Sequence, residues 1–325
     1  MQPHPSRSGG PAAPQAASSA GPSADPSAGP PSEPRVAVII PHHDDAARLD
    51  RCLAALAPQL AALPGLAEAV VVDNGSPADP APRVARFAGI RCVTETARGA
   101  AAARNRGVAE TTAPVLAFLD CDCVPAPDWL ARCRDAAGRG DLMGGRVDTF
   151  DETPPPRSGA EAFETVFAFQ QRRYIADKGF SVTANLVTHR AVFDAVGGMV
   201  PGLSEDMDWC RRATARGYRL VYDDALRVAH PTRRDWPALR RKWRRTTDEM
   251  FALNGTDARA RLRWGGRALA VIASGPAHLP KVWRAAALSG PERRRAAAML
   301  LRLRALRGIW MLRQAIGGGP PGHRG

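Results

Sequence analysis

Residues 115–122 read Val-Leu-Ala-Phe-Leu-Asp-Cys-Asp, an apolar run that ends at two aspartates separated by a cysteine. The continuous apolar run predicts a strand that is buried on both faces, as in the parallel sheets of α/β proteins. Asp120 and Asp122 then lie at the carboxyl end of that strand, where both side chains can reach one divalent cation. A polar turn that ends the strand explains the same two residues, so both interpretations stay open here.

Similar patterns precede and follow this strand. Apolar, β-branched runs at 36–40, 69–72 and 90–93 predict three more strands, and leucines 49, 53, 56 and 60 mark one face of a helix between the first two. The alanine-rich segment 100–109 predicts another helix. This alternation predicts an α/β fold, a Rossmann-like three-layer sandwich with a mainly parallel central sheet. Later segments predict strands at 181–187 and 218–222, a short helix at 190–196 and a helix at 204–216 capped by Ser204.

Polar residues follow three of the predicted strands. Pro41-His42-His43-Asp44 follows the first strand, Asp73-Asn74-Gly75-Ser76 the second and Asp120-Cys121-Asp122 the fourth. Ligands of such sheets bind at the carboxyl ends of the strands, so we expect these residues along one rim. Asp73 can accept a hydrogen bond from a nucleotide base, although a polar turn explains it equally.

Charged residues elsewhere offer two further functions. Arg104, within the segment 103–107, has the bidentate donors that bind phosphate, or it lies on a solvated helix face. Glu205 and Asp206 begin a predicted helix, where acidic side chains favour the helix dipole. One of the two can instead face a cleft and act as a general base.

Composition divides the chain into three parts. Residues 1–34 are mostly Pro, Ala, Ser and Gly, which predicts a disordered leader rather than a secretory signal. From Pro231 onward there are 21 Lys and Arg against 5 Asp and Glu, so the chain's charge of +13 comes from this region. We expect a catalytic domain at 35–231 and a basic helical extension at 232–325 whose last residues are disordered. Six cysteines without a regular spacing indicate reduced thiols in a cytoplasmic protein.

The end of the chain has an amphipathic pattern. Met299, Leu303, Leu306 and Trp310 recur at helical spacing beside arginines. Such a helix can lie on an anionic membrane, which would place the protein at the inner face of the plasma membrane, or it can pack on the catalytic domain. No apolar stretch here is long enough to span a bilayer. No nucleic-acid-binding module is recognisable, so no nucleic-acid partner is expected.

Six segments, taken in order, resemble those of the family 2 glycosyltransferases. They read VIIPHHDD, VVDNGS, ARNRG, LAFLDCDC, TANLVTHRAVFDAVGG and SEDMDWCRRATARGYRLVYDDALRVAH, and they cover roughly residues 35–231. The resemblance implies the GT-A fold and an inverting transfer of sugar from a nucleotide-sugar donor. Relatives usually have an aromatic residue and then Asn after the first Pro, where this chain has His42, His43 and Asp44.

The resemblance also implies roles for individual residues. It implies that Asp206 is the catalytic base, with Glu205 beside it. It implies a divalent cation, Mn²⁺ or Mg²⁺, at Asp122 with Asp120 and His230, although His230 could simply cap a strand end. The residues implied to bind the nucleotide sugar are Pro41, Asp44, Asp73 at the base, Arg104 at the diphosphate, Asp120, and Asn185 at the sugar or acceptor.

The expected function is the transfer of a single sugar by a hexosyltransferase-type enzyme. The acceptor would be a hydroxyl of a glycan or a lipid-linked molecule, in the synthesis of cell-surface polysaccharide or glycolipid. Processive relatives carry a Q-x-x-R-W segment after the Glu-Asp pair, which this chain lacks. Two alternatives are a non-catalytic, membrane-associated carbohydrate-binding or scaffold protein, and a nucleotidyltransferase. The second normally has a glycine-rich loop where this chain has Pro41-His42-His43-Asp44.

Overall fold

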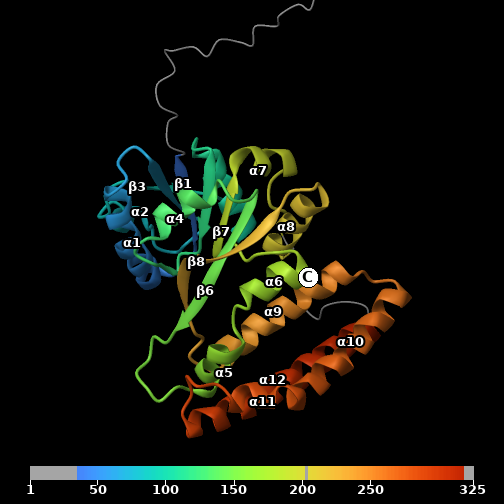
Figure 1. The fold of residues 1–325 in the computed structure, drawn as a ribbon. Coiled ribbons are helices and arrows are strands. Elements are labelled where there is room, and N and C mark those ends of the chain that lie inside the picture. The colour runs from blue at the N-terminus through green and yellow to red at the C-terminus, as the bar shows by residue number, and fades with distance from the viewer. Residues whose placement is uncertain (1–34, 202–203, 318–325) are drawn as a thin grey trace, which may run out of the picture. The chain divides into compact units, whose positions relative to one another are not determined.

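A computed structural model describes residues 35–201 and 204–317 of this protein. The predicted disorder of residues 1–34 and of the last residues falls outside the described ranges. Within those ranges, strands and helices alternate up to the last strand, and only helices follow it (Figure 1).

One eight-stranded sheet forms the centre of the described catalytic part, in the order β3-β2-β1-β4-β7-β6-β8-β5. The strands are β1 (Val36–His42), β2 (Ala67–Asp73), β3 (Ile90–Thr94), β4 (Val115–Leu119), β5 (Val124–Pro125), β6 (Leu142–Phe150), β7 (Asn185–His189) and β8 (Leu220–Pro231). β1, β2, β3 and β4 are mutually parallel, which confirms the predicted half of the sheet. β7 runs antiparallel to both β4 and β6, so the sheet is mixed beyond β4.

Helices cover both faces of this sheet and make it the middle of three layers. The helices before the last strand are α1 (Ala46–Ala61), α2 (Ala81–Val84), α3 (Ala100–Ala109), α4 (Trp129–Ala136), α5 (Gly159–Phe167), α6 (Gln171–Lys178), α7 (Arg190–Val196) and α8 (Glu205–Ala215). Apolar side chains of α1 and α4 pack on one face, and those of α3, α7 and α8 pack on the other. The predicted three-layer α/β architecture is therefore confirmed.

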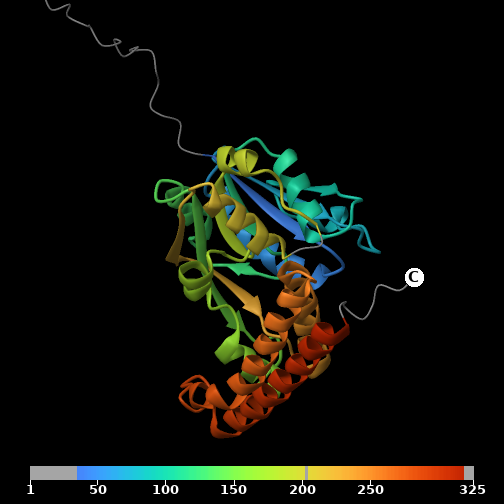
Figure 2. The ribbon, with the colours of Figure 1, turned by 90° about the vertical axis from the view of Figure 1, so that its right-hand side faces the viewer.

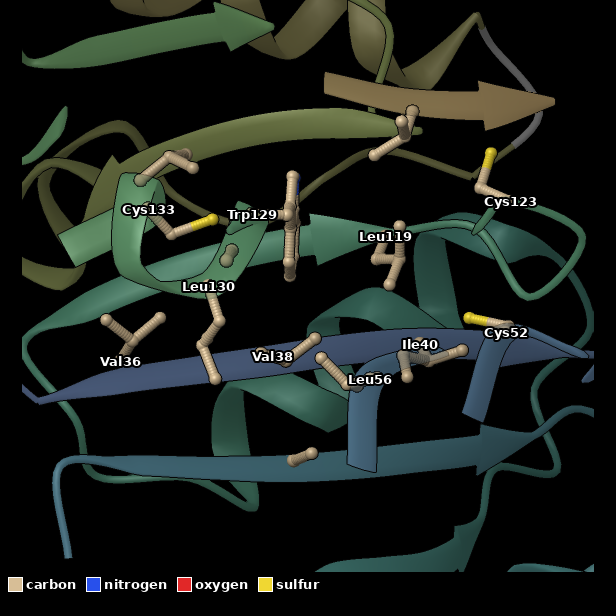
Figure 3. Close-up of a cluster of buried hydrophobic side chains, with 14 of the residues drawn as sticks. Val36, Val38, Ile40, Cys52, Leu56, Leu119, Cys123, Trp129, Leu130 and Cys133 are labelled. Atoms are coloured by element: carbon tan, nitrogen blue, oxygen red, sulfur yellow. The ribbon is translucent and has the colours of Figure 1, made fainter. Parts of the chain in front are cut away.

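The central strands are continuously apolar because both of their faces are buried. In β1, Val38 and Ile40 point into the layer of α1 and α4, whereas Ala37 and Ile39 point into the layer of α3. Figure 3 shows the first of these layers, with Trp129 of α4 packed over the sheet. Strict alternation of side chains along a strand, with an apolar layer on each side, accounts for the run that the sequence shows.

Several elements depart from the sequence-based expectations: β7 begins at Asn185 and not at 181, and β8 continues beyond 222 to Pro231. β6 was not predicted, because Gly144, Gly145 and charged residues interrupt its pattern. The two glycines are needed there: an added Cβ would overlap Ser181 at Gly144 and Asn185 at Gly145. Ser204 does occupy the N-cap position of α8, but its hydroxyl donates to Glu249 Oε2 at 3.2 Å and caps no backbone group, so the predicted cap was wrong.

The basic part of the chain forms a separate layer of helices. These are α9 (Trp236–Asn254), α10 (Ala258–Ala277), α11 (Leu279–Trp283) and α12 (Gly290–Gly317). α10 and α12 lie side by side, beyond α9 as seen from the sheet (Figures 1 and 2). Leu303 and Trp310 of the predicted stripe are buried in this layer, and Met299 packs against its core. No described helix is long and apolar enough to span a membrane.

Candidate active site

The carboxyl ends of β1 and β2 place two of the predicted polar segments side by side. His42 and Asp73 are directly paired in the register of the two strands. Asp73 is 6% exposed; its Oδ2 accepts from the backbone N–H of Ser76 at 3.3 Å, and its Oδ1 has no hydrogen-bond partner within the described chain. A buried acceptor without a partner is suited to a ligand N–H group.

The loop after β1 is held by the loop after β2. Pro41 lies within β1, and Asp44 adopts a left-handed conformation (φ 47°) while its N–H donates to Ser76 Oγ at 2.8 Å. Asn74, which sequence reasoning did not single out, accepts from the N–H of Gly99 at 2.6 Å and donates to the carbonyl of Ala97 at 2.8 Å. Asn74 therefore fixes the rim on which Pro41, Asp44 and Asp73 lie.

Arg104 joins the two acidic segments of the site. Its guanidinium donates to Asp120 Oδ1 at 2.6 Å and to Glu205 Oε1 at 2.7 Å, and the side chain is only 4% exposed. α3 can approach β1 closely enough for this because Gly107, one turn later, lies against Ile39 with no room for a Cβ. Arg104 thus links the end of β4 to the start of α8, and the predicted solvated helix face is excluded.

Asp122 and His230 form a second contact. The short strand β5 pairs with β8 and brings Asp122 Oδ2 to 3.2 Å from His230 Nε2. Burial alone would raise the pKa of Asp122, but the charge and hydrogen bond of His230 outweigh it and lower that pKa to about 2. Asp122 is therefore a carboxylate at any physiological pH.

His230 meets an oxygen at each ring nitrogen. Its Nδ1 lies 2.7 Å from the carbonyl oxygen of Pro231, and its Nε2 faces the carboxylate of Asp122. A neutral imidazole has one N–H group and one lone pair, so it can donate to only one of these two oxygens. A carboxylate and an imidazole, completed by diphosphate oxygens and water, are a ligand set that suits Mn²⁺.

Asp120 does not join this pair, because its carboxylate is engaged by Arg104. Among residues 35–201 and 204–317, no group of three His, Cys, Asp or Glu side chains is arranged to hold a metal ion. The structure thus brings together only Asp122 and His230 of the three predicted ligands. The six cysteines, including Cys121 beside Asp122, are free.

The two carboxylates at the start of α8 have different surroundings. Glu205 is bound to Arg104, whereas Asp206 has no cation partner among the described residues and accepts only from the N–H of Met207 at 2.7 Å. Burial, with the negative charge of Glu205 adding to it, raises the pKa of Asp206 to about 7. A carboxyl group that titrates near neutral pH is well matched to general-base chemistry.

Asn185, predicted to contact the sugar or acceptor, is hydrogen-bonded within the fold in this structure. It is fully buried; its Oδ1 accepts from Trp129 Nε1 at 2.9 Å, and its Nδ2 donates to the carbonyls of Arg146 and Leu226, both at 2.9 Å. All of its polar atoms are used within the fold. Asn185 fixes β7 against β6, β8 and α4.

Phe169 is a site residue that the sequence did not indicate. It lies in the link between α5 and α6 in a left-handed conformation (φ 43°), and its ring centre is 4.7 Å from that of His230. The ammonium of Lys242, from α9, lies 5.2 Å from the same ring centre. No periodic pattern marks an aromatic residue between two short helices, so this contact could not be found from the sequence.

Comparisons with known proteins agree with this fold. The model of the family described as Glycosyl transferase family 2 matches residues 37–197. Glycosyltransferase AglE of Haloferax volcanii is 32% identical over 222 residues, which cover 65% of this chain and 71% of that protein. Pre-mycofactocin glycosyltransferase of Mycobacterium tuberculosis is 31% identical over 222 residues, which cover 62% of this chain but 44% of that protein.

Among solved structures, mannosyltransferase PcManGT from Pyrobaculum calidifontis, in complex with GDP-Man and Mn²⁺, superposes with a TM-score of 0.50. It is 18% identical in sequence, and the match covers 88% of this chain and 74% of that one. This likeness is one of fold, the GT-A fold. With the family match and the archaeal relative, it leads to one conclusion: this chain is a glycosyltransferase and belongs to glycosyltransferase family 2.

Proposed function

We propose that this enzyme transfers a single sugar from a nucleotide-diphosphate sugar to a hydroxyl group of a glycan or lipid-linked acceptor, with inversion. Asp206 accepts the proton of that hydroxyl as its oxygen bonds to the anomeric carbon and the bond from that carbon to the diphosphate breaks. No covalent intermediate between sugar and enzyme is needed. The observation that carries the proposal is the contrast between Asp206, whose pKa is about 7, and Glu205, which is paired with Arg104.

The donor side of the site is assigned to Asp73, Arg104, Asp122 and His230. The unpaired Oδ1 of Asp73 supports a contact with an N–H group of the base. Asp122 and His230 would hold Mn²⁺ or Mg²⁺, which supplies positive charge to the departing diphosphate. Arg104 fixes Asp120 and Glu205 and so sets the distance between the donor and acceptor sides.

A donor screen tests this function. UDP-, GDP- and dTDP-sugars are each added with and without Mn²⁺, and thermal stability and release of the nucleoside diphosphate are measured. GDP-mannose comes first, because the solved mannosyltransferase of this fold contains GDP-Man and Mn²⁺. We expect one nucleotide class to stabilise the protein and to be hydrolysed slowly with Mn²⁺. A scaffold protein would hydrolyse none of them, and a nucleotidyltransferase would instead consume a nucleoside triphosphate.

We also propose that the protein is cytoplasmic and touches the anionic inner face of the plasma membrane through α10 and α12. The exposed large apolar residues of α10 and α12, which lie among arginines, include Leu262, Leu269, Ile309 and Ile316. They support membrane contact through this face, and not through the stripe of residues 299, 303, 306 and 310 that the sequence predicted. The test is flotation with vesicles that contain phosphatidylglycerol. Binding to these but not to pure phosphatidylcholine vesicles is expected; equal binding to both, or to neither, would contradict the proposal.

A further inference from the structure

The described chain contains six buried side-chain nitrogen or oxygen atoms that have no hydrogen-bond partner. Three lie in the active site or in its rim, and three lie in the layer of α9 to α12. The first three are His42 Nδ1, Asp73 Oδ1 and Arg104 Nε, and the second three are Trp243 Nε1, His278 Nδ1 and Arg304 Nε. Buried polar atoms are normally paired, so the atoms of the second group can bind water or a ligand.

Two arginines face the aromatic ring of Trp243, one residue of the second group. On α12, the guanidinium carbons of Arg307 and Arg304 lie 4.7 and 6.0 Å from the ring centre of Trp243. Arg307 is only 7% exposed, yet it donates to Thr247 Oγ1 at 3.2 Å and to Met250 Sδ at 3.5 Å and to no carboxylate. A buried cation without an anion is costly to the fold.

A nearby set of side chains shows how buried cations are normally paired with a carboxylate. Lys242 and Arg233, in the same layer, both bind the buried carboxylate of Glu164, at 2.9 and 3.0 Å. Arg304 and Arg307 have no such partner among the described residues. Their surroundings carry an excess of positive charge that the protein itself does not neutralise.

More cations face the same place from neighbouring helices. Lys178 of α6 and Arg267 of α10 make no ion pair within the described chain, and Arg173 of α6 pairs with Asp177 at 3.3 Å. Burial, with the charges of Arg304 and Arg267 adding to it, lowers the pKa of Arg307 to about 10. Burial lowers the pKa of Lys178 too, and Arg267, Arg173 and Arg307 add to that effect. These pKa directions agree with an uncompensated positive cluster.

The charges of both the proposed base and the cluster act on one residue, Tyr174. Burial raises the pKa of Tyr174, on α6, and both Asp206 and Arg304 are near enough to act on the same hydroxyl. α6 lies between the sheet and α9 (Figure 1), so its residues face the catalytic domain and the helical layer.

We propose that Arg304, Arg307 and Trp243, with Lys178, bind a phosphate or diphosphate group of the acceptor. Guanidinium and indole N–H groups are donors only, and paired guanidinium groups match the oxygens of a phosphoryl group. The inference rests on the proposed transferase function, because it places the anionic part of the acceptor beside the base. It narrows the acceptor class to molecules with a phosphoryl group near the reactive hydroxyl.

The test compares Arg304→Met/Arg307→Met with the wild type and with Arg313→Met. Methionine keeps much of the side-chain volume, and Arg313 is an exposed arginine of the same helix. Calorimetric titrations use inorganic pyrophosphate, farnesyl phosphate and uncharged farnesol, all with EDTA so that metal-dependent binding at Asp122 does not contribute. We expect the double variant to bind both anions about 10- to 100-fold more weakly than the other two proteins.

The outcomes separate the sources of the phosphoryl group. Tighter binding of farnesyl phosphate than of pyrophosphate, with no binding of farnesol, supports a lipid-linked phosphate; equal binding of both anions supports a soluble one. No anion binding by the wild type, or equal binding by the double variant, overturns the proposal. If the double variant does not fold, the single variant Arg304→Met is compared with the wild type instead. Arg304 donates no hydrogen bond within the described chain, so its replacement removes none and the single variant is expected to fold. The proposed transferase function is tested separately: it is contradicted if the wild-type protein hydrolyses no nucleotide sugar, whatever the result of the anion titrations.

Discussion

At the scale of single residues, Arg104 determines how the acidic groups of the site behave. It pairs with Asp120 and Glu205 but not with Asp206, whose pKa burial and the charge of Glu205 raise to about 7. Three carboxylates near one another would otherwise repel, and each would favour its protonated form. Arg104 thus distinguishes Glu205, which it binds, from Asp206, the proposed catalytic base.

Replacing Arg104 tests this role. Arg104→Met should lower the free energy of unfolding by about 3 kcal/mol, because two partly buried carboxylates lose their partner. Arg106→Met is the matched control: it removes an exposed ion pair with Glu110 on the same helix and should cost no more than about 0.5 kcal/mol. Urea denaturation measures both, and equal losses would show that the Arg104 contacts are not structural.

The raised pKa of Asp206 predicts how the activity of the enzyme depends on pH. Because its pKa is raised, the group is protonated below about pH 7 and cannot accept a proton there. We expect kcat/KM to rise as the pH increases through about 7 and then to level off. A profile that rises near pH 4 instead would mean that the base is a carboxyl group with an ordinary pKa.

The same pKa shift affects stability in the opposite direction. The folded pKa of Asp206 lies above its unfolded value, so its contribution to stability is present at low pH and is lost as the pH rises through 7. The protein therefore keeps an acidic group in a place that destabilises the ionised form. This cost at working pH is typical of a functional residue.

At the scale of elements, the close approach of α3 to β1 carries Arg104 into the site. Gly107→Ala should cost about 1–3 kcal/mol, because the new Cβ would overlap Ile39 and push the helix from the sheet. Gly266→Ala is the control: Gly266 lies in exposed α10 with no atom near its Cβ position, and alanine there should be neutral or stabilising by up to about 1 kcal/mol. Thermal unfolding and donor hydrolysis are the readouts, and an equally stable, fully active Gly107→Ala would contradict the proposed coupling.

Elements with a strong local signal could be predicted from the sequence. The strands β1 to β4 and the helices α1, α3 and α7 have continuous or periodic apolar residues, and the structure confirms them. β6 could not be predicted, because its glycines are explained only by neighbours from β7 and α6 that are distant in sequence. Local patterns report local burial, and they do not report what packs from elsewhere.

The site was predictable to a similar degree. Parallel strands bring their carboxyl ends together, so the shared rim of Asp44 and Asp73 followed from topology. The partners of Arg104 could not be predicted, because the sequence does not show whether an arginine binds a phosphate or a carboxylate such as Glu205. For the same reason, the sequence does not show that Asn185 accepts a hydrogen bond from the buried Trp129.

At the scale of the whole molecule, the mixed sheet brings two distant segments together at Asp122 and His230, the pair proposed to bind the metal. Asp122 follows β4, and His230 lies near the end of β8, yet antiparallel pairing of β5 with β8 places them in contact. The donor site therefore requires the complete catalytic fold. The helical layer then adds the cationic residues that are proposed to bind the acceptor.

Metal dependence tests this assembly. A nucleotide sugar at about 100 times its Kd should stabilise the wild type by about 2.7 kcal/mol when Mn²⁺ is present. Asp122→Asn should lose most of the Mn²⁺-dependent part, because the amide is neutral and cannot replace the carboxylate. Thermal shift with Mn²⁺ or EDTA measures the difference. An unchanged response of the variant to Mn²⁺ would place the ion elsewhere.

The central claim is that Asp206 is the base of an inverting sugar transfer, and Asp206→Asn tests it most directly. Donor affinity and turnover are measured on the same preparation, with the nucleotide sugar that the donor screen selects. We expect kcat to fall about 10²- to 10⁴-fold while the Kd for the donor stays within about twofold. Turnover close to that of the wild type, or a loss of donor binding that accounts for the lower rate, would contradict the assignment.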